Sequence, residues 1–158
     1  MVSGEPLCGD TPFSCLSMPA PTVIYDSDCG FCRWCLAKIL AWDRRGVLRP
    51  LKLQSPEAER LLPGMTEEER MASWHFLDRD GRVRSAGAAF PGLLRELPGG
   101  RPLAAVAGRA PRLVDRAYRL VAGHRDTLGP WVTAGAARRA NERIAARLAE
   151  HRVGDPLD

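Results

Sequence analysis

The sequence contains no long hydrophobic run and no recognisable secretion signal. No apolar segment approaches the roughly 18 residues that a membrane-spanning helix needs, so we expect no membrane span. Residues 1–20 contain neither a basic residue nor an apolar core, and so do not resemble a signal peptide. Their Gly, Pro and Ser content predicts a flexible leader on a cytoplasmic protein.

The sequence also lacks internal repeats, low-complexity tracts and known nucleic-acid-binding motifs. Its 158 residues, 45% hydrophobic and 27% charged, are typical of one globular domain. Residues 101–152 hold eleven arginines and four acids, whereas residues 1–100 hold twelve basic and thirteen acidic residues. Because no aromatic-rich basic strand accompanies this charge, we interpret it as a solvated helical face and expect no nucleic-acid partner.

Cysteine is the one reactive residue type that is clustered. The chain has five cysteines, and three of them, Cys29, Cys32 and Cys35, fall within seven residues. The odd number and the clustering do not suit a secreted disulfide framework. In a reducing compartment such a cluster indicates a catalytic or a metal-binding site. Cys8 and Cys15 lie in the expected leader.

Hydrophobic periodicity and turn signals predict an alternating order of strands and helices. We expect strands over residues 21–26 and 46–54, with a helix over 29–45 between them, and a β-hairpin over 72–87. Further helices are expected in residues 55–71, 87–97, 111–125 and 133–152. Apolar residues recur at helical spacing in each of the last two segments. The set in 111–125 is Leu113, Ala117, Leu120 and Val121, and the set in 133–152 is Ile144, Ala145 and Leu148.

This order of elements is the one that a thioredoxin-like domain requires. We therefore expect an α/β fold, a thioredoxin-like three-layer sandwich in which helices flank a central mixed β-sheet, with a helical C-terminal extension. The expected organisation is a leader over residues 1–20, a thioredoxin-like domain over 21–130, and an Arg-rich C-terminal helix and tail over 131–158.

The stretch "TVIYDSDCGFCRWC", residues 22–35, places a dithiol where the first strand leads into the first helix. Free N–H groups and the helix dipole at that helix end stabilise a thiolate, which would lower the pKa of Cys29 from about 8.5. Cys32, three residues later, could form or resolve a disulfide with it. The sequence thus favours a thiol-disulfide oxidoreductase that needs no cofactor.

The neighbouring residues allow more than one interpretation. Cys35 lies one helical turn beyond Cys32 and is interpreted as a buried small hydrophobe rather than a redox group. Asp26 and Asp28 are turn and cap residues, or else one of them accepts the proton of the resolving thiol. Asp28 would oppose a Cys29 thiolate by charge repulsion unless its carboxylate is engaged in capping.

The same residues allow three other functions. The strand followed by Asp26-x-Asp28 resembles an aspartate-based phosphoryl-transfer motif, but Gly30 stands where such enzymes have Thr or Val. Cys29, Cys32 and Cys35 could ligate zinc or an iron–sulfur cluster, although no fourth cysteine follows at ferredoxin spacing. A metal- or cluster-binding protein that uses these three cysteines is the main alternative to the oxidoreductase. A non-catalytic module whose basic helical tail docks a partner is the third possibility.

The motif Tyr25-Asp26-x-Asp28-Cys29-x-x-Cys32 resembles the DCC family of bacterial thiol-disulfide oxidoreductases. The resemblance continues over residues 85–97, with a Ser-x-x-Ala helix start, and over 111–125, with Asp-x-x-Tyr-x-x-x-Ala-x-x-Arg. It implies a thioredoxin-like fold and a dithiol site at Cys29 and Cys32, but it defines no substrate. We expect the substrate to be a disulfide-containing protein or a small-molecule thiol. The resemblance identifies no electron donor. Ser27 and the additional Cys35 depart from the family pattern.

Overall fold

The computed structural model describes residues 19–153, and its centre is a four-stranded mixed sheet. The strands are β1 (Thr22–Tyr25), β2 (Arg49–Lys52), β3 (His75–Leu77) and β4 (Val83–Ser85), in the spatial order β2-β1-β3-β4. β1 pairs parallel with β2 and antiparallel with β3, and β3 pairs antiparallel with β4. This is the predicted thioredoxin-like α/β arrangement, which is thereby confirmed.

Local capping signals place the first helices where the sequence predicts them. Helix α1 (Gly30–Trp42) follows β1. Ser55 caps α2 (Pro56–Leu61) by accepting the Ala58 N–H, and Thr66 caps α3 (Glu67–Met71) in a capping box with Glu69. Each cap satisfies a backbone N–H group that has no partner within its helix.

The remaining elements form the C-terminal half of the chain. They are η1 (Ala86–Ala89), α4 (Phe90–Glu96), α5 (Arg101–Arg109), α6 (Pro111–Gly123), α7 (Arg125–Leu128), η2 (Gly129–Trp131) and α8 (Ala134–Val153). The prediction omitted α5. It correctly placed α6, and the apolar set of that helix faces solvent: Leu113 is 68% exposed and Leu120 is 66% exposed.

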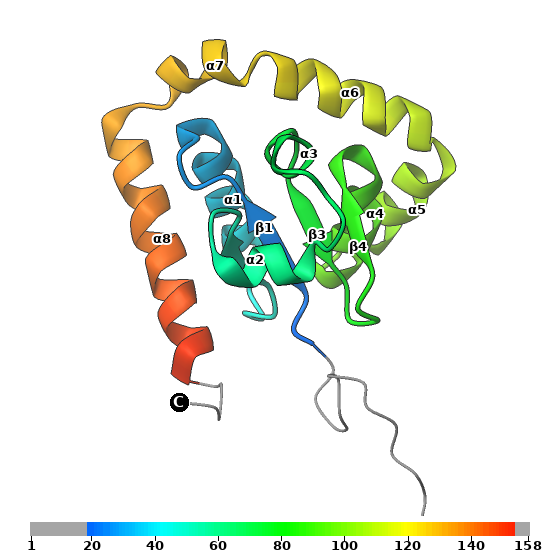
Figure 1. Ribbon diagram of the computed structural model, residues 1–158, viewed down its shortest axis with the longest axis horizontal. Helices are drawn as coiled ribbons and strands as arrows, with labels where there is room; N and C mark the ends of the chain where they lie inside the picture. Colours follow the sequence, from blue (N-terminus) through cyan, green and yellow to red (C-terminus); the bar gives the residue numbers. More distant parts are fainter. Residues whose placement is uncertain (1–18, 154–158) are drawn as a thin grey trace, which may run out of the picture.

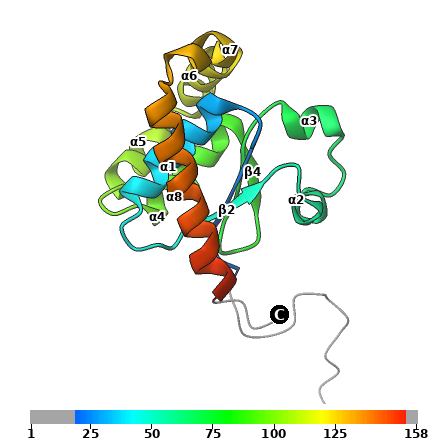
Figure 2. The same cartoon turned by 90° about the vertical axis from the view of Figure 1, so that its left-hand side faces the viewer.

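Helices cover both faces of the sheet and make three layers (Figures 1 and 2). On one face, Val23, Tyr25 and Phe76 of the sheet pack against Leu40 of α1 and Ile144 of α8, among others. On the other face, a second cluster joins the sheet to α2: Ile24, Leu51, Leu53, Ala58 and Leu62. All four residues of β1 are buried, as expected for a central strand with a core on each side.

Helices α6 and α7 cross the end of the molecule where β1 finishes and α1 begins (Figure 1). A Cβ atom on Gly87 of η1 would overlap the backbone of Asp115, so only glycine allows α6 to approach this closely. Beneath α6, Phe90 packs edge-on against both Trp74 and Tyr118, with ring centroids 5.2 and 6.2 Å apart. These contacts hold the inner side of α6 against the fold.

A buried ion pair fixes α8 alongside α1. Asp43 at the end of α1 is 1% exposed, and its carboxylate accepts from the Leu48 N–H at 2.9 Å and from Arg147 of α8 at 2.6 Å. Arg147 also donates to the backbone carbonyl of Asp43 at 3.2 Å. The carboxylate and the guanidinium therefore compensate each other in a region that excludes water.

None of the helices in residues 19–153 is long and apolar enough to cross a membrane. The predicted leader falls almost wholly on residues 1–18, which lie outside the described part of the chain, as do Cys8 and Cys15.

Arg147→Met should destabilise the fold, because it leaves the Asp43 carboxylate buried without its partner. We expect the free energy of unfolding, measured by urea denaturation, to fall by about 3–5 kcal/mol. Arg139→Met, on an exposed position of the same helix, is the control and should change it by less than about 0.5 kcal/mol. A loss for Arg147→Met as small as that of the control would contradict the anchoring role of the ion pair.

Candidate active site

Cys29 occupies the N-cap of α1, immediately after the turn that leaves β1. Its backbone is extended, with φ −81° and ψ 110°, and its Sγ accepts a hydrogen bond from the Cys32 N–H at 3.2 Å. The free N–H groups and the dipole of the helix stabilise negative charge on a sulfur atom in this position. The cap that the sequence suggested for an aspartate is thus provided by the cysteine itself.

Cys32 lies one turn into α1, close to Cys29, and is held as a thiol. Burial is the main cause that raises the pKa of Cys32 above its ordinary value, followed by its interaction with Cys29 and the negative charges of Cys29 and Asp26. The positive charge of Arg125 acts in the opposite direction. The two cysteines of the motif therefore lie in different electrostatic surroundings.

Cys35 is the third free thiol of the cluster. It is partly buried rather than fully buried, and burial, with a smaller contribution from the charge of Cys29, raises its pKa to about 11. At neutral pH such a group is almost entirely protonated and is a weak nucleophile.

The turn before Cys29 is cross-braced by Gln54, which follows β2. The Gln54 amide donates to Asp26 Oδ1 at 2.8 Å, and its oxygen accepts from the Ser27 hydroxyl at 2.9 Å. Asp26 Oδ1 also accepts the Asp28 N–H at 2.9 Å, so Asp26 shapes the turn. Asp28 is exposed, and its carboxylate approaches the Gln54 amide at 3.5 Å.

Tyr118 and Arg125 bring α6 and α7 to the dithiol from the other side. The Tyr118 hydroxyl accepts the Trp74 N–H at 3.4 Å. Burial is the main cause that raises the pKa of Tyr118, and the charge of Cys32 adds to the rise. Arg125 is the cation whose charge acts on Cys32. Cys32, one turn into α1, is partly buried at the end of the fold that α6 and α7 cross, where α7 contacts α1.

Sequence reasoning missed Gln54, Tyr118 and Arg125 as parts of this site. Gln54 had a usable signal, because the residues that follow two parallel neighbouring strands meet at the same sheet edge. Tyr118 and Arg125 are the Tyr and the Arg of the pattern that resembles the DCC family, but helical spacing alone does not indicate that they meet a cysteine.

The other predicted site residues are placed as follows. Tyr25 ends β1 and lies in the core, where burial is the main cause that raises its pKa. Asp26 and Asp28 lie in the turn, beside the dithiol. Among residues 19–153, no three His, Cys, Asp or Glu side chains form a group that could hold a metal ion, so the alternative metal site finds no support in this region.

The raised pKa values of Cys32 and Cys35 predict the order in which the three cysteines of α1 are alkylated. At pH 8, iodoacetamide should modify Cys29 first, because burial raises the pKa of both Cys32 and Cys35 and keeps them protonated. With a pKa of about 11, Cys35 should react far more slowly, and its rate should rise about tenfold per pH unit below that value. Tandem mass spectrometry of tryptic peptides distinguishes modification of Cys29 from modification of Cys35, because Cys35 lies on the separate peptide 34–38. Equal rates for Cys29 and Cys35 at pH 8 would contradict this assignment.

Gln54→Glu should loosen the turn that positions Cys29. The change removes the amide donor and adds a carboxylate beside those of Asp26 and Asp28. Loss of about 1 kcal/mol of turn stabilisation corresponds to a roughly fivefold slower alkylation of Cys29. Asn141→Asp, the same chemical change at an exposed position of α8, should leave the rate unaltered. A normal rate in Gln54→Glu would show that the brace does not position the sulfur.

Comparison with known proteins agrees with this geometry. The family described as DCC1-like thiol-disulfide oxidoreductase matches residues 23–131, which is more than half of the chain and runs from β1 to η2. Neither the curated proteins nor the solved structures gave a match. The matched region contains both cysteines of the dithiol, the turn that precedes them, and the helices α6 and α7 that enclose them. The chain therefore belongs to the DCC1-like thiol-disulfide oxidoreductase family.

Proposed function

We propose that this protein catalyses thiol-disulfide exchange, with Cys29 as the nucleophile and Cys32 as the resolving thiol. The observation that carries the proposal is the hydrogen bond from the Cys32 N–H to Cys29 Sγ at the start of α1. It stabilises a thiolate on the first cysteine, while the surroundings of the second keep a proton on it. Membership of the family supports the same reaction class.

In the reducing direction, the Cys29 thiolate attacks one sulfur of a substrate disulfide. The substrate S–S bond breaks, a mixed disulfide forms between Cys29 and that sulfur, and the other substrate sulfur leaves as a thiolate that takes a proton from solvent. Cys32 then loses its proton and attacks Cys29 Sγ, which releases the second substrate thiolate. The substrate gains the two electrons that the dithiol loses, and a thiol donor must reduce the Cys29–Cys32 disulfide again.

The first step itself prepares Cys32 for the second. Two of the causes that raise the pKa of Cys32 are its interaction with Cys29 and the negative charge of Cys29. Both are lost when Cys29 is neutral in a mixed disulfide, whereas the charge of Arg125 remains. The pKa of Cys32 is therefore lower in the mixed disulfide than in the free dithiol, although burial, the largest cause, still raises it.

We further propose that the protein acts in the cytoplasm, on a disulfide-containing protein or a small-molecule thiol. A free, clustered dithiol is suited to a reducing compartment. The partly buried site, with α6 and α7 over it, favours an extended or small substrate segment over a broad protein surface.

Single replacements of the three cysteines test the assignment. Cys29→Ser should abolish the acceleration that the protein gives to insulin reduction by dithiothreitol, because the nucleophile is missing. When dithiothreitol is left out, Cys32→Ser should accumulate a mixed disulfide through Cys29, detectable by mass spectrometry, because the resolving thiol is missing. Cys35→Ser is the matched control and should retain most of the activity. If Cys29→Ser kept full activity, or if Cys35→Ser lost it, the proposed roles would be wrong.

A further inference from the structure

The outer side of α6 carries an apolar stripe that no element of residues 19–153 covers. Leu113, Leu120 and Val121 are 68%, 66% and 45% exposed, and Ala117 between them is also exposed. Their spacing of four, three and one residues puts them on one side of the helix. Isolated exposed leucines are common on protein surfaces, but a contiguous apolar stripe along a helix indicates an interaction surface.

A row of arginines runs along the same helix beside the stripe. Arg112, Arg116 and Arg119 are all exposed and are spaced by four and three residues, so they too share one side. Arg119 pairs with Asp115 at 2.8 Å. Asp115 is the only acidic residue between Gly100 and His124, against five arginines in that segment. The surface is therefore apolar and strongly basic together.

The inner side of α6 is already used by the fold. Val114, Asp115, Tyr118 and Ala122 are partly buried, and Tyr118 contacts Phe90 and the Trp74 N–H. The apolar stripe is thus separate from the side that packs against the fold. α6 has three distinct sides: the packing side, the apolar stripe and the row of arginines. Beyond α7, η2 carries Trp131, which is 83% exposed.

The chemistry of this surface favours an anionic lipid bilayer as its occupant. A helix that lies in a membrane interface needs an apolar side to enter the acyl boundary and basic residues beside it to meet anionic headgroups. α6 has both, and it lies along the outer end of the molecule, where a flat surface can reach it (Figures 1 and 2). A second copy of this chain would offer the same five arginines on this segment, with Asp115 as its one acid.

We propose that the outer side of α6 docks this protein on the surface of an anionic membrane. α6 and α7 lie over the dithiol end of the fold, and α7 packs against α1, so docking holds that end toward the bilayer. This surface is separate from the cysteines, and the inference stands or falls independently of the redox activity.

Sedimentation with lipid vesicles tests the proposal on the full chain. We expect binding to phosphatidylcholine vesicles that contain about one third phosphatidylglycerol, and at least about tenfold weaker binding to pure phosphatidylcholine. Leu113→Ser with Leu120→Ser should reduce binding at least about tenfold. Arg112→Gln with Arg116→Gln should reduce it about as much, and high salt should weaken it.

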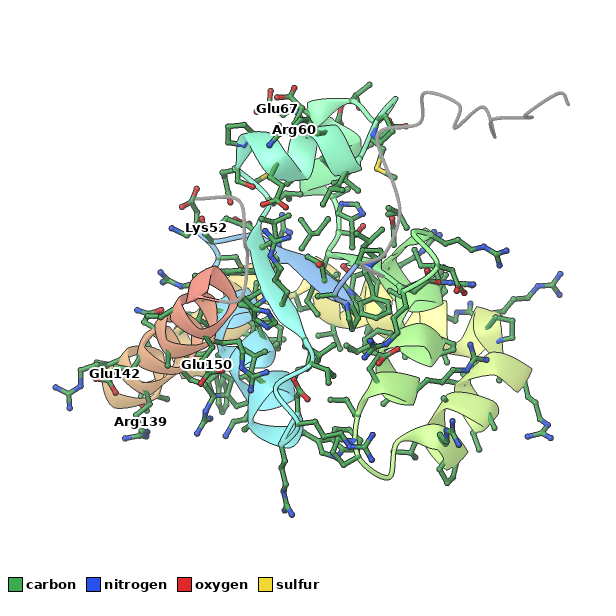
Figure 3. All side chains as sticks on the ribbon, turned by 90° about the horizontal axis from the view of Figure 1, so that it is seen from below. Lys52, Arg60, Glu67, Arg139, Glu142 and Glu150 are labelled. Atoms are coloured by element: carbon green, nitrogen blue, oxygen red, sulfur yellow. The ribbon has the colours of Figure 1, made fainter. Side chains whose placement is uncertain are left out.

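Matched controls separate this surface from general positive charge. Arg60→Gln with Arg139→Gln removes the same charge from α2 and α8, where both side chains point into solvent (Figure 3), and should leave binding within about twofold of wild type. Cys29→Ser should bind as wild type does, which distinguishes docking from catalysis. The arginine variant changes only exposed side chains, so it remains informative if the leucine variant misfolds.

Four results would overturn the proposal. The first is no binding to the anionic vesicles. The second is equal binding to neutral and anionic vesicles. The third is an equal loss of binding in the control pair of arginines. The fourth is a dimer in analytical ultracentrifugation that the leucine variant converts to a monomer without any vesicle binding, which would assign the stripe to a second copy of the chain.

Discussion

The hydrogen bond from the Cys32 N–H to Cys29 Sγ is the interaction around which the rest of the structure is organised. It exists because β1 ends at Tyr25 and α1 begins at Gly30, leaving a short turn whose last residue caps the helix. Gln54 holds that turn from the neighbouring parallel strand, and α6 and α7 close over the second cysteine. Elements that are far apart in sequence thus converge on one pair of sulfur atoms.

Much of this arrangement could be predicted from local signals. Ser55 and Thr66 predict the starts of two helices, and the Asp-Arg-Asp-Gly turn predicts the hairpin. In each case a side chain accepts a hydrogen bond from a backbone N–H group two or three residues later. The position of the dithiol, between a buried strand and a helix, follows from the same local pattern. What local signals do not contain is the approach of distant segments. Gln54, Tyr118 and Arg125 reach the site only through the pairing of strands and the path of α6 and α7.

Helix α6 shows why periodicity alone does not reveal which side of a helix is buried. Leu113, Leu120 and Val121 form the more hydrophobic side, yet the fold packs the side with Val114 and Tyr118 instead. The reason is geometric. Gly87 lets the backbone at Asp115 come close, and the rings of Trp74 and Phe90 meet Tyr118 there. The ring contacts of Tyr118 and the hydrogen bond to its hydroxyl thus fix the rotation of α6 about its axis, and the aliphatic side chains face solvent.

The same helical geometry explains why Cys32, and not Cys35, is suited to resolve a mixed disulfide on Cys29. A helix rises about 1.5 Å per residue, so six residues separate two Cα atoms by about 9 Å along the axis. A disulfide requires Cα atoms within roughly 7 Å, which three residues satisfy and six do not. Cys35 also lacks the influence of Asp26 and Arg125 that acts on Cys32. For Cys35 to form a disulfide with Cys29, the first turn of α1 would have to unwind, and the cap that Cys29 forms on that helix would be lost with it.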